Sequence, residues 1–222
     1  MAAAEMAMMD PHSSPRYNQV VFDIAEYQAR DGKDGYRWDA ETSLGDLNRF
    51  VVRSQGEGTF GEAIDRAELQ AVYSKALDPW WNLQLGVRYD FQPPPSRTCA
   101  TLGLEGLPPY QFHTSWALFL SDKGDLTARL KGSYDQRIMQ RLILQPRLEL
   151  NLSVQDIPDQ RIGSGLSDAE LGLRLRYEIS HEFAPYVGAS WTWKAGHTAD
   201  FVRQDGRGNS ERSFVFGIRT WF

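Results

Sequence analysis

The sequence predicts an all-β protein, a transmembrane outer-membrane β-barrel with about 12 antiparallel strands. Three observations predict it: alternation of apolar and polar residues, a last strand that ends on an aromatic residue, and an asymmetry of connection lengths. Residues 213–222 place Phe214, Phe216 and Ile218 on one side of a strand and Arg219 on the other. An apolar strand face at the very C-terminus is typical of a sheet that closes on itself in lipid.

The same alternation recurs along the chain. Leu171, Leu173 and Leu175 share one strand face, while Arg174 and Arg176 take the opposite one. A soluble sandwich would show the same alternation with its charged face in water, so alternation alone leaves both folds open. In a barrel, the residues expected to face lipid include Leu148, Leu150, Leu171, Leu173, Leu175, Phe216 and Ile218.

Connection lengths favour the barrel. Strand-like segments are expected near 20–30, 35–44, 47–55, 62–75, 80–91, 98–107, 110–120, 124–135, 140–153, 168–180, 183–193 and 213–222. Connections after the even segments are short, and those after the odd segments are longer or richer in turn residues. Outer-membrane barrels show this asymmetry, whereas a Greek-key sandwich scatters its long crossovers. Both termini are therefore expected at the periplasmic end.

Length and composition fit one domain. The chain has 222 residues, a net charge of -5 and a single cysteine, Cys99, which excludes an intramolecular disulfide. The acidic balance argues against nucleic acid as a partner. No apolar run is long enough for a transmembrane helix, and no signal peptide is visible. Residues 1–19 show no strand pattern and are expected to form a disordered, dispensable tail that contains Met and His, before a barrel over 20–222.

Several segments, in this order, resemble the copper-resistance protein B family of outer-membrane proteins. They include Trp38-Asp39-Ala40-Glu41, Gly86-Val87-Arg88-Tyr89-Asp90, Gln140-Arg141-Leu142-Ile143-Leu144-Gln145-Pro146, Glu182-Phe183-Ala184-Pro185-Tyr186-Val187-Gly188 and Gly217-Ile218-Arg219-Thr220-Trp221-Phe222. The resemblance spans roughly residues 20–222. It implies copper tolerance at the outer membrane of a Gram-negative bacterium, with copper as ligand or substrate. It does not say whether copper is bound, exported or admitted.

The N-terminal tail carries the thioether and imidazole side chains that copper prefers. Cu(I) favours thioether and thiolate sulfur, and Cu(II) favours imidazole and oxygen. Met6, Met8, Met9 and His12 are therefore weak candidates for wrapping one ion, alongside the alternative that this stretch binds nothing. The resembling family has an N-terminal segment denser in Met and His.

Charged residues of the alternating segments are expected to point into the lumen. They are Arg37, Asp39, Glu41, Arg49, Arg53, Arg66, Glu68, Arg88, Asp90, Glu105, Arg129, Lys131, Arg147, Glu149, Glu170, Arg174, Arg176, Glu178 and Arg219. Most are expected to stiffen the barrel as ion pairs, because unpaired charge inside a barrel is costly. Glu26, Asp39 and Glu105 are instead expected to be unpaired acids near the mouths, which would attract a cation along a polar path.

His113 is the histidine expected on an inward face, as a metal ligand or as a hydrogen-bonded lumen residue. His181 and His197 are expected in solvated connections. Cys99 is expected to be a small strand residue, and would be a soft ligand if it pointed inward.

Catalysis is not expected. His113 and Ser115 share a strand face but lie about 7 Å apart along it, too far for a nucleophile and its base. The chain has no Gly-x-Ser-x-Gly or His-Glu-x-x-His motif. Two hypotheses remain open: a copper-handling pore, and a non-conducting barrel that binds copper or docks a periplasmic multicopper oxidase. A soluble lipocalin-like binder is a distant third. The barrel is expected to be a monomer in contact with outer-membrane lipid.

Overall fold

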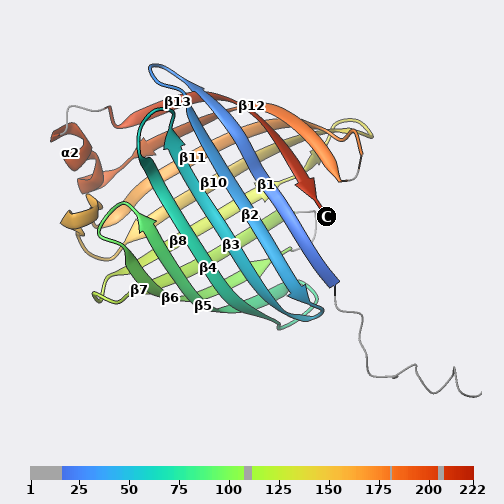
Figure 1. Cartoon of the computed structure of the whole chain (residues 1–222), viewed down its shortest axis with the longest axis horizontal. Helices are drawn as coiled ribbons and strands as arrows, with labels where there is room; N and C mark the ends of the chain where they lie inside the picture. The colour runs from blue at the N-terminus through green and yellow to red at the C-terminus, as the bar shows by residue number, and fades with distance from the viewer. Residues whose placement is uncertain (1–16, 108–111, 181, 205–207) are drawn as a thin grey trace, which may run out of the picture.

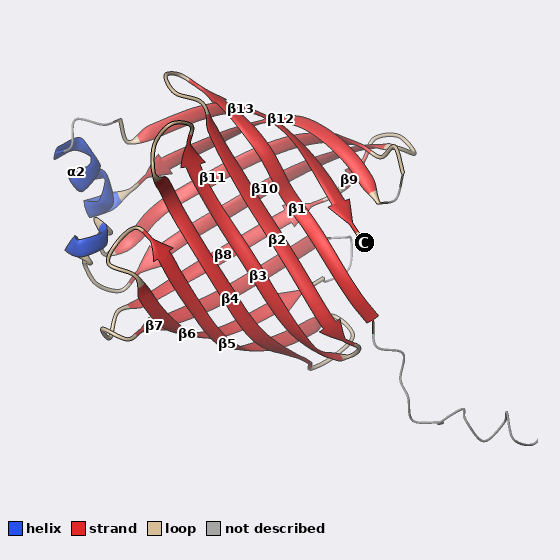
Figure 2. Ribbon diagram, in the orientation of Figure 1, coloured by secondary structure: helices blue, strands red, loops and turns tan. Residues whose placement is uncertain are grey.

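The computed structural model describes residues 17–107, 112–180, 182–204 and 208–222. Almost all of them lie in strands (Figures 1 and 2). The strands are β1 (Tyr17–Arg30), β2 (Gly35–Gly45), β3 (Asn48–Thr59), β4 (Ile64–Ala76), β5 (Trp81–Gln92), β6 (Arg97–Gly106), β7 (Phe112–Ser121), β8 (Leu126–Tyr134), β9 (Gln136–Arg137), β10 (Leu142–Ser153), β11 (Gly165–Tyr177), β12 (Phe183–Lys194) and β13 (Ser210–Trp221).

The sheet closes into a barrel. Neighbouring strands pair antiparallel from β1 to β8, then through β10, β11 and β12 to β13, and β13 pairs with β1. The closing seam sets Ala29 opposite Phe214 and Tyr27 opposite Phe216. Leaving out the two-residue β9, which lies beside β10, twelve of the thirteen strands form the wall. The predicted strand number and antiparallel topology are confirmed.

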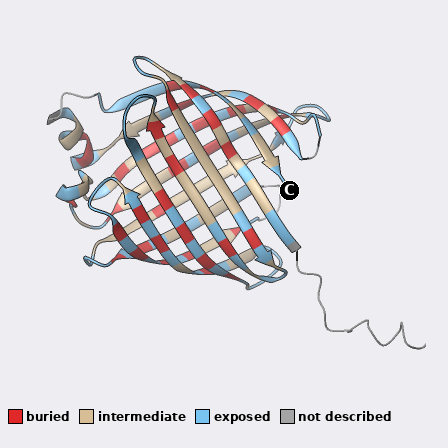
Figure 3. Ribbon diagram, viewed as in Figure 1, coloured by how far each residue is buried: buried red, intermediate tan, exposed pale blue. Residues whose placement is uncertain are grey.

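Burial alternates along most of the strands, most regularly in β4, β5 and β6 (Figure 3). Leu171, Leu173, Phe216 and Ile218 are exposed on the outer surface, as predicted, whereas Arg174 and its inward neighbours are buried. A soluble sandwich would hide these leucines in a shared core. A closed barrel with an apolar outer surface and a charged interior instead requires lipid around it.

The connection asymmetry is real but rests on two loops. Residues 154–164 and 195–209 are long, and they contain a short 3-10 helix (Pro158–Gln160) and helix α2 (Gly196–Gln204). The other connections at that end, 31–34, 60–63, 93–96 and 122–125, are no longer than several at the opposite end. The sequence pattern did not predict α2, which lies at the end of the barrel away from the C-terminus (Figure 1).

The expected boundary of the barrel shifts slightly. β1 begins at Tyr17, three residues before the predicted start at residue 20. Residues 1–16, and with them the expectation of a disordered tail, lie outside the described residues. Within the described part of the chain, no helix is long and apolar enough to cross a membrane, a finding that concerns helical spans alone.

Candidate functional site: the charged lumen and its outer vestibule

Glu149 lies at the centre of the lumen network. Four cations surround its carboxylate: Arg37 at 3.4 Å, Arg129 at 3.6 Å, Arg147 at 3.8 Å and Lys131 at 3.9 Å. The Glu149 side chain is 7 % exposed. A carboxylate this deeply buried is tolerated only because several positive charges and hydrogen-bond donors face it.

The network crosses the barrel. Lys131 on β8 lies 3.7 Å from Asp39 on β2, and these strands are six steps apart whichever way the ring of twelve is followed, so they stand on opposite walls. Arg37 on β2 also donates a hydrogen bond to Glu170 on β11. Gln55 on β3 donates to Asp39 at 2.6 Å and accepts from Lys131 at 3.1 Å. The polar side chains therefore span the lumen rather than lining its wall.

A second bridge joins β8 to β4. Arg129 holds Glu68 in a two-pronged contact, with N–O distances of 2.5 Å and 2.8 Å. Planar guanidinium and carboxylate groups match each other in this arrangement, which makes such pairs strong and directional. The Phe119 ring lies beneath this region, with the Arg88 guanidinium 3.8 Å from its centroid. Arg88 in turn donates to Asp90 at 2.8 Å.

Glu26 is the most deeply buried of the predicted acids. Its side chain is 0 % exposed and accepts hydrogen bonds from Arg174 at 3.0 Å, Tyr186 at 3.1 Å and Gln28 at 2.9 Å. Gly217 is needed opposite, because a Cβ there would come within 2.5 Å of the Tyr186 ring. Glu26 is thus locked between β1, β11 and β12.

The prediction that Glu26, Asp39 and Glu105 are unpaired acids near the mouths is wrong. Glu26 pairs with Arg174 and Asp39 with Lys131 and Arg147. Glu105 pairs with Arg53 at 2.7 Å and also accepts from Gln84. The partners come from strands far away in the sequence, so strand parity could place these acids inside the barrel but could not show what faces them.

His113 lies on the inward face of β7, as predicted, but near the periplasmic end, where its side chain is exposed. Strand pairing places His113 beside Ser133. Glu105 and Lys131 instead flank Ser115, the next inward residue of β7 toward the extracellular end. Cys99 points inward and is buried, with its Sγ 3.8 Å from Arg88 and 4.0 Å from Asp90. His197 is exposed in the long loop of α2, as expected, and His181 lies outside the described residues.

The lumen opens toward the long loops. A vestibule of about 770 Å³ reaches from α2 and the loop residues Asp31, Lys33 and Glu62 down to the Glu68–Arg129 bridge. In the opposite half of the barrel, inward positions carry buried apolar side chains, Val51 and Val72 among them. The lumen is therefore wide and polar at its extracellular end, and it is filled by ion pairs and apolar side chains toward its periplasmic end.

Asp23 and Tyr186 face the lumen, although neither was among the residues predicted to do so. Asp23, which pairs with Arg219 at 3.0 Å and with Arg147 at 3.5 Å, follows Phe22 at a β-bulge that breaks the simple alternation of β1. Tyr186 follows the regular alternation of β12, so its inward position was available from parity. A bulge is hard to read from one sequence because it changes the period only locally.

Within residues 17–107, 112–180, 182–204 and 208–222, no three His, Cys, Asp or Glu side chains come together in a way that could hold a metal ion. The tail candidates Met6, Met8, Met9 and His12 lie outside the described residues.

Comparisons with known proteins identify the family. The profile described as "Copper resistance protein B precursor (CopB)" matches residues 16–222. Copper resistance protein B of Escherichia coli is 41 % identical over 212 residues, which cover 95 % of this chain and 71 % of that protein. The homolog of Pseudomonas syringae pv. tomato (strain ATCC BAA-871 / DC3000) is 39 % identical over 212 residues, covering 95 % and 72 %.

Solved structures support the fold alone. The NanC porin superposes with a TM-score of 0.60 at 17 % identity, covering 92 % of this chain and 99 % of the porin. The KdgM porin gives a TM-score of 0.56 at 12 % identity, with coverage of 92 % and 99 %. The barrel, its apolar exterior and its copper-resistance relatives place the protein in the bacterial outer membrane. The chain belongs to the copper resistance protein B family.

Proposed function

We propose that this protein supports copper tolerance as an outer-membrane barrel whose lumen is closed in the resting state. Copper would then be handled at the ends of the barrel rather than by free passage through it. The observation that carries this proposal is the set of ion pairs between opposite walls, above all Lys131 with Asp39 and Arg37 with Glu149. Ions cross a pore only if its sites release them, and a lumen filled by mutually neutralising side chains leaves no continuous wet path.

The periplasmic end is the favoured site of action. Both the start of β1 and the end of β13 lie at the end of the barrel that carries the short connections (Figure 1). The Met and His residues of the tail precede β1, so they would act on this side, as weak copper ligands or beside a periplasmic multicopper oxidase. The exposed His113 lies at the same end. A monomeric barrel suffices for this role.

Copper flux tests the proposal. Purified full-length protein in liposomes loaded with a copper-sensitive dye should admit no more copper than empty liposomes, while a general porin in parallel liposomes admits it freely. A sustained copper-dependent flux or single-channel current through the unmodified protein would overturn the closed-lumen proposal.

A lumen route for copper is the second candidate, favoured by the vestibule that leads from outside to Glu68 and Asp90. In that case copper would have to displace the cations that are paired with Glu105, Asp39 and Glu26, and His113 would be the imidazole within reach. Replacing Glu105 and His113 together (Glu105→Gln, His113→Ala) should then lower copper tolerance at equal barrel yield. Unchanged copper tolerance would contradict a lumen route and would favour copper handling by the tail or by a partner protein.

A further inference from the structure

An apolar groove runs along the outside of the barrel wall. It has a volume of about 610 Å³ and crosses β11, β12 and β13 near their long-loop ends, where Ala29, Arg30 and Asp31 at the end of β1 also line it. Strand register places Ala189 between Leu173 on one side and Phe214 on the other. Because alanine is small while its neighbours are large, β12 forms a trough with raised sides. Leu173 is 47 % exposed and Phe214 is 70 % exposed.

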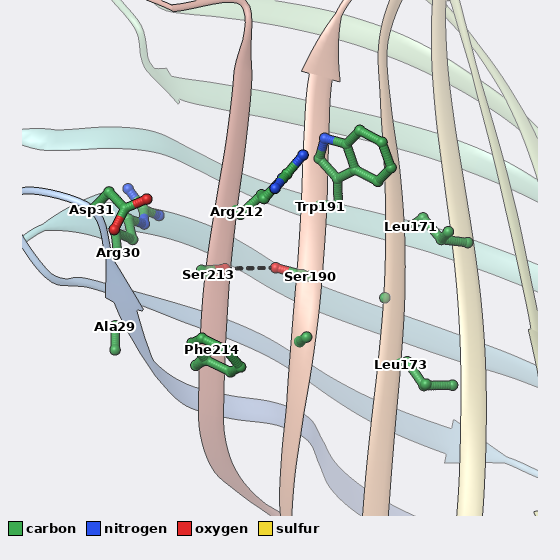
Figure 4. A pocket seen from close by; sticks show the side chains of 12 residues that line it. Ala29, Arg30, Asp31, Leu171, Leu173, Ser190, Trp191, Arg212, Ser213 and Phe214 are labelled. Atoms are coloured by element: carbon green, nitrogen blue, oxygen red, sulfur yellow. Dashed lines mark hydrogen bonds between the residues drawn. The ribbon is translucent and has the colours of Figure 1, made fainter.

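A cation marks one end of this groove. In the next outward row, Trp191 lies opposite Leu171 on one side and opposite Arg212 on the other. Figure 4 shows Arg212 extending toward Trp191, and its guanidinium lies 5.3 Å from the ring centroid. Among the described residues, Arg212 has no carboxylate within salt-bridge distance, and no other outward strand position carries an arginine.

This placement leaves Arg212 available to an anion at the membrane surface. Lipid-facing positions of barrels disfavour charge, with a penalty that fades toward the interface. Tryptophan is typical of that interfacial level, so Arg212 stands where lipid headgroups meet the barrel. The long-loop end is the extracellular end, which places the groove in the outer leaflet. Arginine matches phosphate oxygens better than any other side chain, because its donors form a planar fork.

We propose that this groove binds a phosphorylated lipid of the outer leaflet, with a phosphate on Arg212 and an acyl chain over Ala189 between Leu173 and Phe214. The proposal rests on charge complementarity at one end and on shape along the rest. It requires a specific lipid at one place on the wall, unlike the interchangeable lipids that surround any barrel. It is independent of whether the lumen conducts.

Native mass spectrometry of the full-length protein released from detergent tests the proposal. The probe is lipid A, which carries phosphates and several acyl chains, compared with enzymatically dephosphorylated lipid A. The unmodified protein should retain one lipid A, and dephosphorylation should weaken binding about tenfold, the effect of losing one good charge-assisted contact. Arg212→Gln should weaken binding of lipid A to the same extent and abolish the preference for phosphate.

Ala189→Phe fills the trough and should weaken binding of both lipid forms. Two matched variants serve as controls: Lys75→Gln changes an outward cation at the opposite end of the wall, and Ala100→Phe enlarges an outward alanine on β6. Both controls should bind lipid A as the unmodified protein does. The proposal would be overturned if Arg212→Gln and Ala189→Phe bound lipid A as tightly as the unmodified protein does, with all variants shifting normally on heating in SDS gels. It would also be overturned if the unmodified protein bound lipid A and dephosphorylated lipid A equally tightly.

Discussion

The two faces of β11 carry opposite chemistry one residue apart. The Leu173 side chain is 47 % exposed on the outer wall, whereas the Arg174 side chain next to it is 3 % exposed inside the lumen. In a soluble protein the arginine would be in water and the leucine in the core. The inversion teaches that two different environments stabilise the two faces: lipid covers the outside, and oppositely charged side chains neutralise the inside.

The two faces should respond differently to substitution. On the lipid side, the partner is a fluid solvent, so one apolar residue can replace another. On the lumen side, each charge faces named partners on other strands, so its loss leaves a buried opposite charge behind. Two substitutions measure this difference, and a third, in a loop, shows a site that belongs to neither face.

The largest effect is expected inside. Arg174→Met should destabilise the barrel by about 3–5 kcal/mol, because Glu26 is then a buried carboxylate without its cation. The free energy of unfolding in urea, measured in lipid vesicles, reports it. Arg203→Met is the control: its pair with Asp200 on α2 is exposed, and exposed pairs contribute roughly 0–1 kcal/mol. Equal losses in the two variants would show that the Glu26 pair does not differ from a surface pair.

The next effect is expected outside. Leu173→Lys places a charge on the lipid face one outward row from the interfacial Trp191, so it should cost less than the roughly 2–4 kcal/mol of a position at the bilayer centre. Reduced yield of heat-modifiable barrel on SDS gels, with urea unfolding of the remaining folded protein, measures it. Leu173→Met keeps the face apolar and should assemble normally. Normal assembly of the lysine variant would contradict the outward assignment of this residue.

The smallest effect is expected in the extracellular loops, where neither lipid nor burial contributes. The pKa of the Asp156 carboxyl lies below its ordinary value, first because the Ser164 amide donates to it at 2.6 Å, and then because His197 is close. A lowered carboxyl pKa means that the ionised form stabilises the folded loop. This contribution is complete above the ordinary carboxyl pKa of about 4 and is lost as the pH falls through the lower, folded-state value.

The Ser164 amide proton shift in an NMR titration follows this contact. It should change as the pH falls below the ordinary carboxyl pKa of about 4. Asp156→Asn should remove the transition while the barrel resonances stay in place. A transition of the same size in the asparagine variant would assign the titration to another group.

The alternation of single residues carried most of the fold prediction. Period-two patterns around Leu173 and Arg174, or around Leu148 and Glu149, depend only on the geometry of a strand, which is local. They therefore predicted the wall, its two faces and the charged interior without any knowledge of which strands are neighbours. The long connection at 195–209 was visible as a loop, but its helix α2 was not, because a short polar helix leaves no clear periodic signal.

Pairing inside the lumen was decided only by the tertiary structure. Closure of the sheet brings Lys131 to Asp39, Arg53 to Glu105 and Arg174 to Glu26. These partners lie on different strands, so nothing local to Glu26, Asp39 or Glu105 distinguishes a free acid from a neutralised one. The sequence by itself determined that charge lies inside the barrel. Only the curvature of the closed wall, which sets the distance between opposite strands, decided which charges pair across the lumen.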